Sequence, residues 1–392
     1  MLYKTLLSDT KKDLTKLSDI SIKKVQGYRD LTNFIKLPWD IYLEDPNWVP
    51  PLMLERRMHL STANPFFKHA EACFWMALRK ERPVGRISAQ IDRLYLDRYG
   101  DDTGFWGMLE AVDDREVFEA LFDSAAKWLK SKGMKRMLGP FNLSINQECG
   151  LLVKGFEHPP FFMMGHNPPY YAERLCELGH KKARDLIAYL IERTDEGLSR
   201  IEELLGGLKA DFTTRPLNKK NLESELDSIF SIFNNAWARN WGFVPFTRDE
   251  YLELGKSMSK IASPELIRIA VVKEEAAGFI ALLPNVNEII RDLDGRLFPF
   301  NWARLIFRLK HHNFNSGRVV LMGVLQKYQG SLAGAAISLC LIRDVIKQTL
   351  KTSIKQVELS WILEDNIAMN RIIEGLGATP YKTYRIFERD IP

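Results

Sequence analysis

The sequence predicts an α/β (α+β) protein with two similar domains in tandem, each a mixed, mostly antiparallel sheet flanked by helices. The chain of 392 residues is too long for one ordinary hydrophobic core, so two domains of about 150 to 200 residues are expected. Short apolar runs with strand character alternate with longer segments of helical period. The order of these elements in residues 1–195 is repeated in residues 196–392, which we take as the two domains.

The composition excludes several classes of protein. Hydrophobic residues make up 46% and charged residues 27% of the chain, as in soluble globular proteins. The 55 basic residues are interspersed with 50 acidic ones, so no nucleic-acid partner is expected. The four cysteines stand far apart without a C-x-x-C pair, which predicts neither a zinc site nor a disulfide framework. The charged N-terminus and the lack of a run of ~18 apolar residues predict a cytoplasmic protein that does not span a membrane.

The first half is expected to begin with a hairpin, because two strand-like runs flank a charged turn at residues 81–83. Asp113 and Asp114 then precede a segment of helical period and are expected to cap that helix. The expected elements, in order, are strands 74–80, 84–93 and 104–111, helix 115–132, a short strand at 137–141, helix 169–179 and strand 185–192.

The second half repeats this order after a mostly polar stretch, residues 193–200, which is the expected seam between the domains. Its expected elements are helix 224–241, strands 266–273, 277–284 and 318–325, a long helix from Gly330, strand 356–363, helix 366–377 and strand 383–389.

The segment 319–348 predicts an anion site. An apolar run, VVLMGVL, meets a glycine-bearing turn, QKYQGSLAG, and then an apolar helix. The first amides of a helix have no partner within it and lie at the positive end of its dipole. A strand that feeds such a loop into a helix therefore suits a phosphate or a pyrophosphate.

Two motifs in the second half resemble those of the GCN5-related N-acetyltransferase (GNAT) superfamily. The pyrophosphate loop of that family, [Q/R]-x-x-G-x-[G/A], is met by Gln329 and Gly334, whereas Leu332 occupies the middle glycine position; Gly330 matches the variant that begins R-G. The helix pattern N-x-x-x-x-x-L-Y-E-x-x-G is met by Asn366, Ile372, Glu374 and Gly377, but Ile373 replaces the tyrosine that often serves as general acid.

The first half is similar but degenerate. Its 167–179 segment, with Tyr170 and Tyr171, is similar to the family helix, yet its loop at 112–114 offers two carboxylates where a phosphate needs amides. The cofactor is therefore expected in the second half, and the first half is expected to supply wall and substrate contacts. The layout, with its stretches 41–52, 64–77, 139–156 and 234–247, also resembles bacterial tandem GNAT proteins of the ceramide synthase type, some of which are associated with acylating sphingoid bases.

The resemblance implies an acyl-CoA-dependent N-acyltransferase that uses acetyl-CoA or a longer acyl-CoA and a primary amine, either a small molecule or a lipid such as a sphingoid base. In the family, two strands splay apart and the pantetheine pairs with the first; here these are 318–325 and 356–363. The expected CoA-binding residues are Met322, Gly323, Val324, Gln329, Gly330, Ser331, Leu332, Ala333, Gly334 and Asn366. The alternative is a non-catalytic ligand-binding or regulatory protein that kept the fold, as Leu332 and Ile373 would allow.

Acyl transfer to an amine also needs a base, an acid and an acceptor pocket. Glu358 and Glu110 are the candidate bases and Tyr384 the candidate acid; a salt-bridged glutamate and a core tyrosine are the structural alternatives. The candidate acceptor contacts lie in two polar and aromatic stretches: Asn142, Asn146 and Glu148, and Trp237, Asn240 and Trp241. These stretches can instead satisfy their own polar groups or dock a helix on the sheet.

The segment 298–312, FPFNWARLIFRLKHH, predicts a basic amphipathic helix. Such a helix can lie in a membrane interface, which would add a peripheral contact at the inner membrane face, or it can cover the core of its own protein. His311 and His312 lack a carboxylate at ligand spacing, so no metal is predicted. The sequence does not indicate the oligomeric state.

Overall fold

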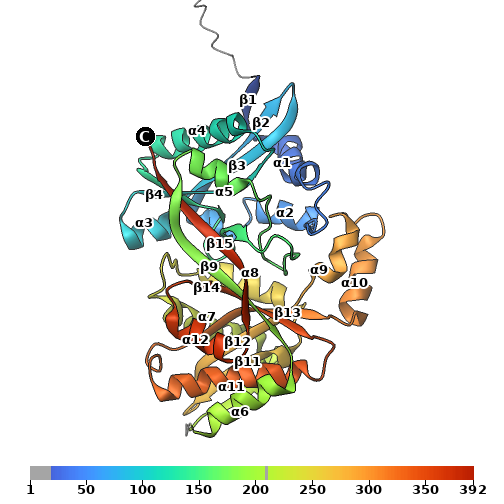
Figure 1. The fold of residues 1–392 in the computed structure, drawn as a ribbon, viewed down its shortest axis with the longest axis vertical. Coiled ribbons are helices and arrows are strands. Elements are labelled where there is room, and N and C mark those ends of the chain that lie inside the picture. The colour runs from blue at the N-terminus through green and yellow to red at the C-terminus, as the bar shows by residue number, and fades with distance from the viewer. Residues whose placement is uncertain (1–18, 208–210) are drawn as a thin grey trace, which may run out of the picture.

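The computed structural model describes residues 19–207 and 211–392. Within them, one mixed sheet of thirteen strands runs through the molecule in the order β1-β2-β3-β4-β5-β15-β9-β14-β13-β12-β11-β10, with β8 paired to β15 (Figure 1). The fold class predicted from the sequence is therefore confirmed.

The strands fall into three sets along this sheet. One end holds β1 (Ile20–Lys24), β2 (Ala70–Arg79), β3 (Arg82–Asp92), β4 (Thr103–Ala111) and β5 (Arg136–Gly139). The other end holds β10 (Thr213–Pro216), β11 (Ile267–Val272), β12 (Glu275–Pro284), β13 (Ser316–Val324) and β14 (Gln356–Leu363). The middle holds β9 (Lys181–Glu192), β15 (Thr379–Asp390) and β8 (Leu151–Lys154), and a separate ribbon pairs β6 (Phe141–Asn142) with β7 (Glu148–Cys149).

The two halves exchange strands at the centre of the sheet. β15, the last strand of the chain, pairs with β5 of the first half, with Phe387 opposite Gly139. β9, from the first half, pairs with β14 of the second half, with Ile191 opposite Val357. β9 and β15 also pair with each other, so each half completes its sheet with a strand of the other.

The helices lie on both faces of this sheet and, just before β13, to one side of it (Figure 1). They are α1 (Gly27–Ile41), α2 (Met53–His59), α3 (Arg93–Tyr99), α4 (Arg115–Ser131), α5 (Tyr171–Glu177), α6 (Asp195–Gly206), α7 (Leu222–Trp237), α8 (Arg248–Ser259), α9 (Asn287–Ile290), α10 (Asn301–His311), α11 (Leu332–Thr349) and α12 (Ile367–Gly375). Asp114 accepts a hydrogen bond from the Glu116 amide and caps α4 as predicted. The expected seam at 193–200 contains the start of α6, which Thr194 caps.

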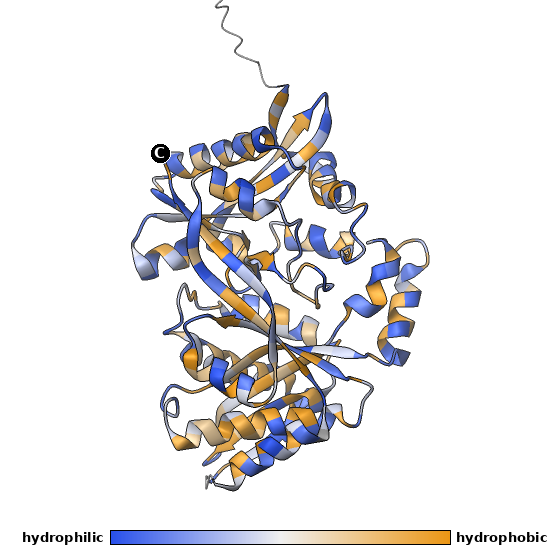
Figure 2. Ribbon diagram, in the orientation of Figure 1, coloured by the Kyte–Doolittle hydropathy of each residue, from blue (hydrophilic) through white to orange (hydrophobic). Residues whose placement is uncertain are grey.

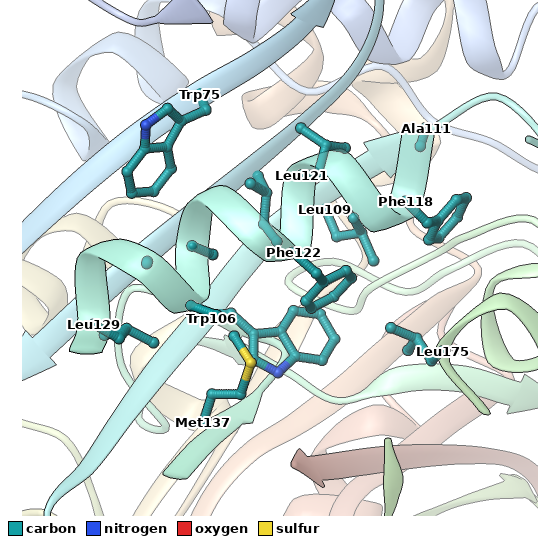
Figure 3. Packing of buried hydrophobic residues seen from close by; sticks show 14 of the residues in the cluster. Trp75, Trp106, Leu109, Ala111, Phe118, Leu121, Phe122, Leu129, Met137 and Leu175 are labelled. Carbon is teal, nitrogen blue, oxygen red and sulfur yellow. The ribbon is translucent and has the colours of Figure 1, made fainter. Parts of the chain in front are cut away.

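Each half has its own hydrophobic core. In the first half, α4 packs Leu121 and Phe122 against Trp106 of β4, and the rings of Phe122 and Trp106 meet edge to face (Figure 3). In the second half, α7 packs on the side of β12 that carries Phe279 and Leu283. α11 packs on the side that carries Ile280 and Leu282. Successive residues of a strand point to opposite faces, so α7 and α11 lie on opposite faces of the sheet.

Candidate active site

The sheet opens between β13 and β14. The two strands are parallel neighbours over only four residue pairs, from Ser316 opposite Gln356 to Val319 opposite Leu359. Beyond this point both strands continue but no longer pair with each other. The residues past the last pair line a cavity of about 1020 Å³.

This cavity reaches both faces of the sheet. On the α7 side its wall includes Phe233 and Phe246, and on the α11 side it includes Ile342 and Val345. Because α7 and α11 cover opposite faces, the cavity passes through the sheet at the gap between the two strands. The gap between the two strands therefore joins the parts of the cavity on the two faces.

The free edge of β13 presents amide donors to this gap. The Leu325 amide donates to the Ala277 carbonyl of β12 at 2.9 Å. Backbone groups of alternate residues point to opposite edges of a strand, so the amides of Val324 and Met322 face the gap. The carbonyls of these two residues already accept bonds from Trp237 Nε1 (3.0 Å, to Met322) and Gln329 Nε2 (2.9 Å, to Val324). The edge thus offers N–H groups, whereas its carbonyl acceptors are occupied.

The loop between β13 and α11 is held tightly around its glycines. Gly330 has φ +70°, a left-handed conformation that suits glycine. A Cβ on Gly334 would lie 2.1 Å from the Tyr328 carbonyl oxygen, so the chain can pass there only without a side chain. Ser331 caps α11 by accepting from the Gly334 amide at 3.1 Å. The Leu332 side chain is 77% exposed and leaves the interior of the loop unfilled.

Most of the predicted CoA-binding residues line the cavity. They are Met322, Gly323, Val324, Gln329, Gly330, Ser331, Leu332, Gly334 and Asn366. Ala333 is not part of the wall, but it lies in the first turn of α11, where its amide and that of Leu332 have no acceptor within the helix. Asn366 also caps α12 by accepting from the Met369 amide at 3.2 Å.

Glu358 lies behind the cavity wall. Its side chain is fully buried, and one carboxylate oxygen accepts from Ser360 Oγ at 2.6 Å and lies 3.4 Å from Arg318 Nε. The other oxygen accepts from the Tyr381 hydroxyl. Ser360 and Arg318 line the cavity and Glu358 does not, so the carboxylate is connected to the cavity through these two side chains. Burial lowers the pKa of Arg318, and the adjacent Glu358 opposes this shift.

Tyr384 is buried next to this network and outside the cavity wall. Within the described residues its hydroxyl has no hydrogen-bond partner, and burial raises its pKa well above the ordinary value. Its ring packs edge to face on Trp361, with ring centres 6.5 Å apart. This geometry matches the core alternative that the sequence left open for Tyr384.

Glu110 lies in the first half, away from the cavity. It accepts from the hydroxyls of Tyr42 (2.7 Å) and Tyr171 (2.9 Å), and Arg86 is 3.6 Å away. Burial raises the pKa of Glu110 to about 7, and the Arg86 charge opposes the shift. Glu110 is therefore part of a separate, closed polar cluster.

The chain itself fills the equivalent gap in the first half. β4 and β5 pair only from Thr103 to Phe105, and β6 lies against the next part of β4. A Cβ on Gly107 would lie 1.9 Å from the Phe141 carbonyl oxygen, and Asn142 Oδ1 accepts from the Met108 amide at 2.8 Å. The place that corresponds to the cavity of the second half is therefore filled in the first half by the backbone at Phe141 and Asn142.

The predicted acceptor contacts divide into two groups. Asn146, Trp237, Asn240 and Trp241 line the cavity. Asn142 and Glu148 do not: the Asn142 amide donates to Glu148 at 2.9 Å, and Glu148 pairs with Arg56 at 3.1 Å. For these two residues the polar groups satisfy one another, as in the structural alternative.

Sequence reasoning missed several residues of the cavity wall, above all Arg318, Ser360, Trp361 and Cys149. Arg318 and Glu358 are register partners on β13 and β14. Two charges on otherwise apolar parallel strands could have indicated a buried pair, but only once the register was known. In residues 19–207 and 211–392 no group of His, Cys, Asp and Glu side chains is arranged to hold a metal ion.

Several solved structures similar to this chain are GNAT proteins. The tandem GNAT protein from the clavulanic acid biosynthesis pathway has a TM-score of 0.54 at 13% identity, covering 95% of this chain and 99% of that one. A GCN5-related N-acetyltransferase from Sphaerobacter thermophilus has a TM-score of 0.53 at 12% identity, covering 95% and 96%. Together with the opened sheet and the loop before α11, this likeness shows that the chain has a tandem GNAT fold.

Two curated proteins are similar over nearly the whole chain. Protein YghO of Escherichia coli is 45% identical over 363 residues, 92% of this chain and 93% of its own length. The bacterial ceramide synthase of Caulobacter vibrioides is 42% identical over 376 residues, 95% and 98%. The chain belongs to the family of these two proteins. No protein-family model matches it.

Proposed function

We propose that this protein transfers an acyl group from acyl-CoA to a primary amine. The observation that carries the proposal is the cavity that passes through the sheet between β13 and β14. A thioester held in the gap would be open to an amine from the other face. In this proposal residues 196–392 bind CoA, and residues 1–195 supply β9 and part of the acceptor wall.

The residues present suit the parts of CoA. Its phosphates would lie on the loop from Gln329 to Gly334, where the amides of Leu332 and Ala333 and the dipole of α11 favour an anion. Its pantetheine would run along the open edge of β13, which offers amides to carbonyl acceptors. When bound, acyl-CoA would supply the activated acyl carbon, and the CoA thiolate would be the leaving group.

The protein groups at the gap suit aminolysis of a thioester. The amide of Met322 or Val324 would donate to the oxygen that becomes negative in the tetrahedral intermediate. The Ser360 hydroxyl lines the cavity and would take the proton that the attacking amine releases, passing its own to Glu358. Arg318 keeps a positive charge beside that carboxylate.

The cavity suits an acyl chain longer than acetyl and a lipid amine such as a sphingoid base. Its volume lies at the upper end of the usual range for small-molecule sites, about 300 to 1,000 Å³. The wall on the α11 and α12 side is largely aliphatic, with Ile342, Val345, Ile346, Ile372 and Leu376. The name of the bacterial ceramide synthase supports the same substrate class.

The test is release of the CoA thiol from acetyl-CoA and from palmitoyl-CoA, each with and without a set of primary amines that includes sphinganine. We expect release that depends on both the acyl-CoA and the amine, with palmitoyl-CoA preferred. If acyl-CoA binds but no amine releases thiol, the protein is a non-catalytic binding protein and the proposal fails.

A further inference from the structure

Helix α10 and the loop before it expose large apolar side chains to solvent. Phe298, Phe300 and Phe307 are 73%, 79% and 64% exposed, and Trp302 and Ile306 are each 47% exposed. Figure 2 shows hydrophobic and hydrophilic residues side by side on this helix. We call these five residues the α10 patch. Large exposed apolar patches are uncommon on soluble proteins and often mark a surface that binds another molecule.

The core of the protein does not need these side chains. α10 attaches through its inner face, where Leu305 and Leu309 pack on the cluster that contains Ile289 and Leu293. Arg308 fixes the same face by donating to the Ile289 carbonyl at 2.8 Å and to Asp292. Leu305 and Leu309 cover the core of the protein, as one of the two expectations for this helix has it. The side chains of the α10 patch remain exposed to solvent.

The element that carries the patch is pinned to the first half. Trp39 Nε1 donates to Asp294 at 2.6 Å, and the Met53 amide donates to the Gly295 carbonyl at 2.9 Å. The Arg291 guanidinium donates to the Pro46 carbonyl. These contacts join the start of the segment that carries the patch to the first half.

The charge around the patch is positive. Residues 291–312 contain five basic residues, Arg291, Arg296, Arg304, Arg308 and Lys310, and two acidic ones, Asp292 and Asp294, a formal excess of three positive charges. Asp292 is shared between Arg304 (2.9 Å) and Arg308 (2.5 Å). The part of the patch that continues into helix 301–311 contains no acidic residue. Exposed aromatic side chains with a basic border suit the interface of an anionic bilayer, where rings enter the headgroup region and cations meet lipid phosphates.

We propose that the α10 patch seats the protein on the surface of an anionic phospholipid bilayer. No helix within residues 19–207 and 211–392 is long and apolar enough to cross a membrane, so this contact would be peripheral. A second copy of the chain is the rival occupant, but two such surfaces would bring like charges together. The proposal concerns location and does not depend on acyl transfer.

The test is co-flotation with vesicles of phosphatidylcholine alone and of phosphatidylcholine mixed with phosphatidylglycerol. We expect the protein to float with the mixed vesicles and much less with phosphatidylcholine alone. Replacing Phe298→Ser together with Phe307→Ser should lower the bound fraction at least tenfold, and Lys310→Glu should lower it for the anionic vesicles. Leu204→Ser, at a half-exposed leucine on α6, is the matched control and should bind as the wild type does.

All substituted side chains are exposed, so the variants should keep the melting temperature of the wild type, and thiol release with a water-soluble amine should be unchanged. The proposal is overturned if the wild type floats with neither vesicle, or if the double variant floats as well as the wild type. It is also overturned if sedimentation velocity shows a dimer that the double variant abolishes while vesicle binding is absent, because the patch then binds a second copy.

Discussion

Glu358 and Arg318 form a buried ion pair at the cavity: Arg318 lines the wall, and Glu358 lies behind it and accepts from the Ser360 hydroxyl. A buried pair gives little net stability, because the desolvation of two charges offsets their attraction. The pair therefore suits the role that we propose for it, in which Ser360 contacts the substrate and Glu358 accepts the proton behind it.

We predict that Glu358→Gln lowers kcat for thiol release by a factor of about 10² or more, the usual size of a general-base contribution. The KM for acyl-CoA should change little, because Glu358 does not line the cavity. Steady-state kinetics over a pH series check this. Glu388→Gln, which removes a partly exposed carboxylate 3.3 Å from Arg136, is the matched control. A loss of activity that follows only the melting temperature would show a structural role.

We predict that the free energy of unfolding depends on pH through Glu110. Its pKa is raised from 4.5 to about 7 in the folded protein, so between these values the native state binds more protons than the unfolded state. The stability due to this proton is fully present below about pH 4.5 and is lost as the pH rises through 7. The difference corresponds to on the order of 3 kcal/mol.

The variant Glu110→Gln should lack this pH-dependent contribution to stability, because glutamine does not titrate. In urea unfolding, the stability of the wild type relative to Glu110→Gln should therefore fall between pH 4.5 and pH 7.5. The comparison must be a difference, because burial lowers the pKa of His180 to about 3, which gives a stability change of the opposite sign in the acid range. A constant difference would contradict the raised pKa.

At the scale of elements, the loop before α11 depends on Gly334 more than on the missing middle glycine. We predict that Gly334→Ala destabilises the protein by about 1 to 3 kcal/mol, because the new Cβ overlaps the Tyr328 carbonyl. Gly375→Ala in α12 meets nothing within 4 Å and should stabilise by up to about 1 kcal/mol. Thermal unfolding of both variants is the measurement, and equal effects would contradict the loop geometry.

Elements of strong period were predicted well from the sequence. The strand 356–363 matches β14, and the helix 115–132 matches α4 to within a residue. The helix 224–241 was expected to be longer than α7, which ends at Trp237, where the Asn240 amide turns back to the Trp237 carbonyl. That turn carries Trp241 to the cavity wall. The periodicity of a sequence indicates which face of a helix is buried. It does not indicate the residue at which a polar turn ends the helix.

Pairing between distant strands could not be predicted. The strand segments 185–192 and 383–389 are found as β9 and β15, but nothing in their patterns tells which half each one joins. For the same reason the contact between Ser360 and Arg318 could not be predicted, because it depends on the register of β13 and β14. Local motifs predicted most of the cavity wall that β13 and the loop before α11 form, whereas the wall built by both halves required the whole fold.

At the scale of the whole molecule, the exchange of β9 and β15 couples the halves. A fragment 1–195 would leave β5 without β15, and a fragment 196–392 would leave β14 without β9. We predict that neither fragment unfolds cooperatively alone, and that the two co-expressed fragments form a complex with a single thermal transition. Calorimetry is the check. Two independent transitions in the intact chain would contradict the coupling.

The central claim, that the second half binds CoA at the loop before α11, is tested most directly by isothermal titration with CoA. Gly330 has a left-handed conformation with open space around it, so Asp and Asn fit there equally well. We predict one CoA per chain for the wild type, an affinity at least tenfold weaker for Gly330→Asp, whose charge repels the pyrophosphate, and near wild-type affinity for Gly330→Asn. Absence of CoA binding, or equal affinity in the Asp and Asn variants, would contradict the account.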